Sequence, residues 1–354
     1  MRQLFSAGGL VLSLLTLAPA ARAGDQAAIN RAVERGVAAL RQMQEADGTW
    51  PCREIGATAL AGLTLLECDV PASDPAVKLA ARAVRDESGS LTRTYSLALS
   101  ILFLDRLGEE SDVPIIESLT VRLLAGQNAN GGWPYECPEV PEAEARRLSS
   151  LFKQRAELRA RPKSGDPARK GNKAEDAERT VTSRQLTEEI HKQIQVINRA
   201  TGAKVESVRD DNSNTQFAVL ALWVARRHGL PTEDALKQVT NRYRKTQNSD
   251  GGWGYQTQTR FNRSTPTMTC AGLLGLAVGY GTNEAALRTE MPKGSDKAAK
   301  PPDPTRDPAV RKGLAALGTT IGHPVGREKG RQVPRLSVGG RQTHNERIAR
   351  DNRR

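Results

Sequence analysis

The sequence predicts an all-α fold of stacked helical hairpins arranged in an inner and an outer layer. Three observations lead to this prediction. A heptapeptide of the form Gln-x-x-x-Gly-x-Trp occurs three times, as "QEADGTW" at 44–50, "QNANGGW" at 127–133 and "QNSDGGW" at 247–253. Each copy follows an amphipathic stretch, and each precedes an apolar stretch with helical spacing.

The first 23 residues are excluded from this fold because they have the layout of a secretory signal peptide. Arg2 is followed by an apolar run that ends near Ala18, and the small-residue sequence "ARA" closes the segment. The run is short for a membrane span, although a short anchor is the alternative. We expect cleavage after Ala23 and an exported protein, either periplasmic or secreted.

The first repeat region covers residues 24–138 and begins with the amphipathic stretch "AAINRAVERGVAALRQMQ". Its apolar residues recur every three or four positions, which is typical of one face of a helix. After each such helix a glycine supplies the turn, because glycine adopts positive φ without a Cβ clash. The turn glycines are Gly48, Gly131 and Gly251.

Four apolar helices in all alternate with the amphipathic ones and share a register. Aligned on a threonine, they have leucine five residues later and leucine or isoleucine two residues after that. The threonines are Thr58, Thr94, Thr215 and Thr269, and the last aligned positions are Leu65, Ile101, Leu222 and Leu276. A helix that is apolar on most faces belongs inside, so about five outer and four inner helices are predicted.

Three regions lack the repeat: an insert, a linker and a tail. Residues 139–206 are highly charged and predict an insert of two helices around a disordered "RPKSGDPARKGNKAED". The second repeat region covers 207–290, and a linker follows at 291–306. A last outer helix at 307–320 contains "AVRKGLAAL", which matches "AVERGVAAL" at 32–40. Residues 321–354 predict a basic, disordered tail.

The net charge of +12 is unevenly distributed. The repeat regions carry −6 over 24–138 and +3 over 207–290, whereas the insert carries +4 and residues 291–354 carry +9. Arguments from basic charge therefore apply only to the insert and the tail. Because the chain is predicted to be exported and lacks aromatics interleaved with the basic residues, we expect no nucleic-acid partner.

Four cysteines are expected in a compartment that permits disulfides. Cys52 and Cys137 each follow a repeat tryptophan closely, and a bridge between them is one interpretation. Cys68 and Cys270 lie in apolar helical stretches, where a cysteine is most often a small buried hydrophobe.

The heptapeptides resemble the "QW" repeats of squalene–hopene cyclases, and the chain is similar to the terpenoid cyclase and protein prenyltransferase superfamily. The stretch from "DNSNTQFAVLAL" to "MTCAGLLGLA" looks like exported bacterial proteins named for prenyltransferase and squalene-oxidase repeats. The resemblance covers about 25–138 and 207–320 and implies an α/α toroid, here partial or incomplete. It also implies that Gln44–Trp50, Gln127–Trp133 and Gln247–Trp253 are structural clasps, in which glutamine bonds to the start of the next helix.

The resemblance does not extend to the cyclase acid. Squalene–hopene cyclases protonate an alkene with the middle aspartate of Asp-x-Asp-Asp, and this chain has Asp211, Asn212, Ser213 and Asn214 there. Ser213 is too weak an acid for that step. Asp211 beside Asp210 is a weak candidate, because paired carboxylates raise one pKa. The simpler interpretation is that these residues cap the helix that follows.

No metal or cofactor is expected. Protein prenyltransferases bind zinc through Asp, Cys and His, but Cys270 has no aspartate two residues before it. His228 ends an inner helix, where histidine offsets the helix dipole, and the remaining histidines fall in the insert or the tail (His191, His323 and His344). The thioester sequence "GCGEQ" of complement-like toroids is also lacking.

The repeat count suggests an incomplete ring, since a closed toroid of this superfamily takes about six or seven hairpins and four are found here. One interpretation is that the natural protein continues beyond a truncated or out-of-frame tail; the other is a genuine basic tail. An unclosed arc would expose apolar edges, so oligomerisation is expected in that case.

Three functions remain open after this comparison. The first is a non-catalytic exported scaffold that binds a peptide, polysaccharide or apolar ligand in its inner concavity, with peripheral membrane contact as a variant. The second is a cyclase- or transferase-type enzyme that uses Asp211 or an acid beyond the present C-terminus. The third is a basic adaptor that docks anionic envelope polymers through the insert and tail.

Overall fold

The computed structural model describes residues 25–160, 181–182, 184–197, 210–257, 262–290 and 303–320. Within this part of the chain helices dominate and no β-strand is present, only two isolated bridges, so the all-α prediction is confirmed. The predicted signal peptide, the middle of the insert, most of the linker and the tail from residue 321 lie outside the described residues.

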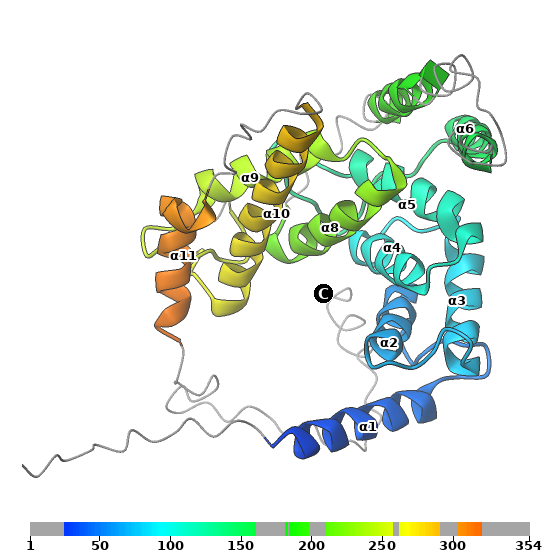
Figure 1. Ribbon diagram of the computed structural model, residues 1–354, viewed down its shortest axis with the longest axis horizontal. Coiled ribbons are helices and arrows are strands. Elements are labelled where there is room, and N and C mark those ends of the chain that lie inside the picture. Colours follow the sequence, from blue (N-terminus) through cyan, green and yellow to red (C-terminus); the bar gives the residue numbers. More distant parts are fainter. Residues whose placement is uncertain are drawn as a thin grey trace, which may run out of the picture.

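Four apolar helices form an inner row. They are α2 (Ile55–Glu67), α4 (Thr94–Leu107), α8 (Asn212–Ala225) and α10 (Pro266–Glu290). Helix α4 packs against α2 and α8, and α8 packs against α10. In Figure 1 these helices line the inside of an arc. The last aligned position of the predicted register is fully buried in all four helices, at Leu65, Ile101, Leu222 and Leu276.

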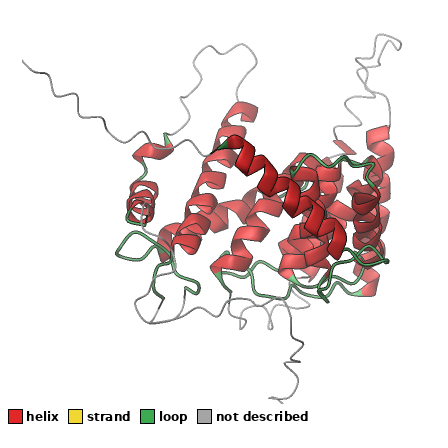
Figure 2. Ribbon diagram, turned by 90° about the horizontal axis from the view of Figure 1, so that it is seen from below, coloured by secondary structure: helices red, strands yellow, loops and turns green. Residues whose placement is uncertain are grey.

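Amphipathic helices lie on the outside of the same arc (Figure 1). They are α1 (Gln26–Met43), α3 (Pro75–Glu87), α5 (Val113–Ala125), α9 (Glu233–Thr246) and α11 (Pro308–Gly318), and short 3₁₀ turns occur at Glu110–Asp112, Arg226–His228 and Pro304–Arg306. Helix α3 packs on α2, α5 on α4, and both α9 and α11 on α10. Figure 2 shows many of the connecting loops along one edge of the molecule.

The insert contains the two helices that the sequence predicts, α6 (Glu142–Ala160) and a helix over 184–197. Helix α6 packs against α5 and buries Leu148 and Phe152. This contact explains why α5 is more apolar than α3 and α9: the insert covers a face that the other outer helices leave open to water. Arg155 of α6 also donates to Glu117 of α5 at 3.0 Å in a buried ion pair.

The structure does not form the Cys52–Cys137 bridge that the sequence left open, and neither helical cysteine is buried as expected, since Cys68 is intermediate and Cys270 exposed. All four cysteines are free, with Cys52 exposed and Cys137 buried, so no bridge joins them. Burial raises the pKa of the Cys137 thiol to about 12, and this thiol contacts the Thr94 hydroxyl. Cys270 is exposed rather than buried, because it shares an exposed stripe of α10 with Ala277, seven residues later.

Candidate functional site

The three Gln-x-x-x-Gly-x-Trp segments, hereafter the first, second and third clasps, join consecutive outer helices. Each glutamine amide donates to the carbonyl of its own clasp glycine and to an alanine carbonyl in the first turn of the next outer helix. The pairs to alanine are Gln44 to Ala76 at 2.9 Å, Gln127 to Ala235 at 2.9 Å and Gln247 to Ala309 at 2.8 Å. The glutamine thus acts as a donor to carbonyls of the next outer helix, not as an acceptor for the inner helix that follows it.

The clasp tryptophans make the connection between outer and inner helices. Each indole Nε1 donates to a carbonyl ten residues earlier in its own outer helix, at Leu40, Leu123 or Tyr243. Each tryptophan amide points to the hydroxyl of an inner-helix threonine of the predicted register, at Thr58, Thr215 or Thr269. All three indole rings are buried, so they offer no stacking surface to a ligand.

The clasp glycines have the predicted positive φ, at +90° for Gly48, +79° for Gly131 and +86° for Gly251. A Cβ at these positions would lie 2.5–2.7 Å from a backbone carbonyl oxygen of the next outer helix. These carbonyls belong to Leu79, Gln238 and Lys312, each three residues after the alanine that the glutamine bonds. Glycine is therefore required twice, for the turn and for the close approach of two backbones.

The start of α8 carries the residues that a cyclase comparison singles out. Asp211 is the N-cap of α8, because its carboxylate accepts from the Asn214 amide N–H at 2.7 Å. The same carboxylate accepts from the Asn214 side chain at 2.7 Å, and Asp211 is only 1% exposed. The capping prediction is thus confirmed for Asp211, and its carboxylate is enclosed rather than presented to a substrate.

Asp210 does not cap the helix. Its carboxylate accepts two hydrogen bonds from the Arg242 guanidinium of α9, at 2.8 and 2.6 Å, and one from Asn128 at 2.6 Å. Both charged side chains are 1% exposed. Since Asp210 and Asp211 have separate sets of donors, they do not form the paired acid that the sequence left open.

Three tyrosines that were not predicted as site residues lie close together near Ser213. The Tyr95 hydroxyl pairs with the Ser213 hydroxyl, and the Tyr135 hydroxyl pairs with that of Tyr255, each at 2.5 Å. Tyr95 also packs against Phe217, with ring centroids 5.1 Å apart. We call Tyr95, Tyr135 and Tyr255 the tyrosine cluster.

The clasp loops position this cluster at the first turns of inner helices. The carbonyl of Tyr135 accepts from the Thr94 amide of α4, and the carbonyl of Tyr255 accepts from the Asn212 amide of α8. Tyr135 is 52% exposed and Tyr255 39% exposed. A sequence signal did exist, because both tyrosines stand two residues after a clasp tryptophan.

The hydroxyls of Tyr95 and Tyr255 are held neutral. Burial raises the pKa of Tyr95, and the charge of Asp211 adds to this effect. The pKa of Tyr255 is raised by burial, by its hydrogen bond with Tyr135 and by Asp211. The cluster therefore presents aromatic ring faces and neutral hydroxyls, which donate and accept hydrogen bonds but supply no strong acid.

No zinc-type ligand set forms within the described residues, which contain no group of three or more His, Cys, Asp or Glu side chains able to hold a metal ion. His228 instead pairs with Asp105 at 2.9 Å and links the C-terminal ends of α4 and α8. His191 lies in the helix over 184–197, whereas His323 and His344 lie outside the described residues. In the part of the chain that the structure describes, no helix has the length and hydrophobicity to span a membrane.

A scan against protein-family models gives no match for this chain, and no curated protein is significantly similar to it.

Proposed function

We propose that the described helices form part of an α/α toroid, and that the protein is an exported, non-catalytic scaffold that binds a ligand at the tyrosine cluster. Support for the toroid comes from the alternation of inner and outer helices and from three clasps with the same contacts. Support for export comes from the N-terminal sequence alone. The ligand is a peptide, a polysaccharide or an apolar molecule.

One observation carries the proposal: a hydroxyl pair stands where a cyclase of this type would carry its acid. Ser213 pairs with Tyr95. The two nearest carboxylates are buried and already hydrogen-bonded, Asp211 to Asn214 and Asp210 to Arg242. Protonation of an alkene needs an acid that is free to donate, and none of these groups meets that need.

The chemistry of the cluster suits binding. Tyr135 and Tyr255 are the most exposed of its members, so part of each side chain is open to a ligand next to the clasp loops. Tyrosine rings supply large apolar contact area with a polar end, which suits recognition of sugars, peptides and apolar chains.

The test uses the full chain with two probes, a soluble β-glucan in affinity electrophoresis and squalene in a fluorescence titration. We expect at least one probe to bind the wild type. The double variant Tyr135→Ala/Tyr255→Ala should weaken that binding about tenfold or more. The double variant to Phe keeps the rings and separates stacking from hydrogen bonding, and Tyr280→Phe is the control outside the cluster.

The tyrosine cluster is overturned as the ligand site if neither probe binds the wild type. It is also overturned if both probes still bind the double alanine variant. A parallel incubation with squalene tests the enzyme alternative by mass spectrometry. We expect no cyclised product. A product that disappears in Asp211→Asn would establish the enzyme in place of the scaffold.

A further inference from the structure

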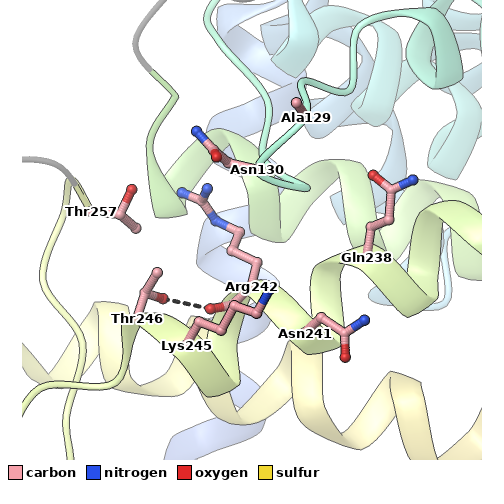
Figure 3. A pocket seen from close by; sticks show the side chains of 8 residues that line it. All are labelled: Ala129, Asn130, Gln238, Asn241, Arg242, Lys245, Thr246 and Thr257. Atoms are coloured by element: carbon pink, nitrogen blue, oxygen red, sulfur yellow. Dashed lines mark hydrogen bonds between the residues drawn. The ribbon is translucent and has the colours of Figure 1, made fainter.

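A second site, distinct from the tyrosine cluster, is a polar pocket of about 380 Å³ where the second clasp meets helix α9. Figure 3 shows the residues that line it, which come from three segments of the chain. Asn130 comes from the second clasp, Thr257 from the loop after the third clasp, and Gln238, Asn241, Arg242 and Lys245 from α9. The volume lies within the range typical of pockets for small ligands.

The α9 residues form a single polar stripe. Positions 238, 241 and 245 are spaced by three and four residues, so their side chains share one helix face. Gln238, Asn241 and Lys245 are all exposed. Their carboxamide and ammonium groups are donors that water satisfies in the free protein and that a bound acceptor would replace.

The charge of the pocket is positive and comes from one residue. Arg242 is neutralised by Asp210 behind it, through hydrogen bonds at 2.8 and 2.6 Å. Lys245 forms no ion pair with another described residue, and no aspartate or glutamate is among the residues that line the pocket. An approaching anion therefore meets one uncompensated ammonium group without a competing carboxylate.

The residues that line the pocket also determine the polarity of the part of the ligand beyond its anionic group. It contains no aromatic residue and no aliphatic side chain larger than alanine. An apolar ligand would thus bury the donors of Asn130, Gln238 and Asn241 without partners, which is unfavourable. Carboxamides both donate and accept, so they match hydroxyl groups beside the anionic group.

We propose that this pocket binds a carboxylate-bearing, hydroxyl-rich ligand such as an acidic sugar, with Lys245 contacting the carboxylate and the carboxamides contacting the hydroxyls. A single free positive charge matches a monoanionic carboxylate better than a phosphate dianion, because one ammonium group balances only one negative charge.

The experiment is isothermal titration of the full chain with glucuronate, with glucose as the neutral isostere and with inorganic phosphate. We expect glucuronate to bind about tenfold more tightly than either of the others, and the binding to weaken as salt is raised. Lys245→Gln should lower glucuronate affinity about tenfold and leave glucose binding unchanged. Asn241→Asp, which places a carboxylate in the pocket, should abolish glucuronate binding.

The matched control is Lys237→Gln, which removes an exposed lysine of the same helix that does not line the pocket. It should bind glucuronate as the wild type does, and all variants should unfold at the wild-type temperature because the side chains are exposed. The proposal is overturned if glucuronate binds no better than glucose, or if Lys237→Gln weakens binding as much as Lys245→Gln. If inorganic phosphate binds more tightly than glucuronate, a carboxylate ligand is excluded and a phosphorylated ligand takes its place.

Discussion

The first and third clasps carry an ion pair that the second clasp lacks. Arg41, three residues before Gln44, donates to Asp74, the N-cap of α3, at 2.7 Å. Arg244, three residues before Gln247, pairs with Asp307, the N-cap of α11. In both cases the pair ties the last turn of one outer helix to the first turn of the next.

In the second clasp both partners of this pair are different. Leu124 stands three residues before the glutamine, and Thr232 precedes α9. The charge at this joint lies deeper, in the buried pair between Asp210 and Arg242 that Asn128 of the clasp also bonds. The contacts of glutamine and glycine therefore define the clasp, whereas the position of its charges differs from one joint to another.

The largest expected effect comes from breaking the buried pair at the second clasp. Arg242→Met leaves Asp210 buried without its charged partner, and the loss of such a partner costs about 3–5 kcal/mol of unfolding free energy. Urea unfolding followed by circular dichroism measures it. The matched variant Arg244→Met, at the third clasp, removes a pair in which the arginine is 40% exposed and the aspartate 2% exposed; it should cost less, because Asp307 keeps its hydrogen bonds from Tyr280 and the Ala309 amide. Equal losses would contradict the greater contribution of the pair in which both side chains are buried.

An intermediate and uniform effect is expected from the clasp glycines. Gly48→Ala, Gly131→Ala and Gly251→Ala each place a Cβ at positive φ and within 2.7 Å of a carbonyl oxygen. Each should lower the unfolding free energy by about 1–3 kcal/mol. Gly36→Ala in α1 is the control, because nothing lies within 4 Å of its Cβ and alanine is the better helix former by about 0.5–1 kcal/mol. A loss at only one of the three clasps would show that their backbones are not equivalent.

The smallest effect is a pH dependence at the third clasp. Burial acts to raise the pKa of Asp307, but hydrogen bonds from Arg244, Tyr280 and the Ala309 amide outweigh it and lower the pKa to about 2. Because an unfolded aspartate titrates near 3.9, this group stabilises the fold fully above about pH 4, and the contribution is lost as pH falls toward 2.

Asp307→Asn should therefore lower stability at pH 7 by up to about 2 kcal/mol, because the lowered pKa of this buried carboxylate corresponds to roughly that free energy, and the difference from wild type should shrink between pH 4 and pH 2. Urea unfolding at pH 7, 4 and 3 measures this. Asp234→Asn, at an exposed position in the first turn of α9, is the control. If the stability of Asp234→Asn changes with pH in the same way as that of Asp307→Asn, the pH-dependent contribution to the unfolding free energy does not come specifically from the ion pair of the third clasp.

Much of the fold could be predicted because its determinants are local. The inner threonines and the buried leucine or isoleucine that follows them recur at fixed spacing, and the clasp glycines need positive φ whatever surrounds them. The N-cap role of Asp211 is equally local, since its acceptor and donor lie three residues apart. The exposure of Cys270 was missed because apolar composition does not reveal which stripe of α10 remains open.

The candidate site was harder to predict, since its parts are distant in sequence. Tyr95 and Ser213 are 118 residues apart, and Tyr135 and Tyr255 are 120 residues apart. Only 4% of the residues are aromatic, yet packing of successive repeats places three of the five tyrosines together. Similarly, the pairing of Asp210 with Arg242 rather than with Asp211 depends on α9 lying beside the start of α8.

The sequence by itself determined the helices, their alternation between inner and outer positions, and the turn at each clasp, because periodicity and glycine conformation act within a few residues. Only the tertiary structure decided what each clasp joins and where the charges lie. Gln127 reaches Ala235 across 108 residues, and such a contact exists only once neighbouring repeats have packed. The physical reason is that a hydrogen bond or ion pair depends on distance in space, which no local pattern specifies.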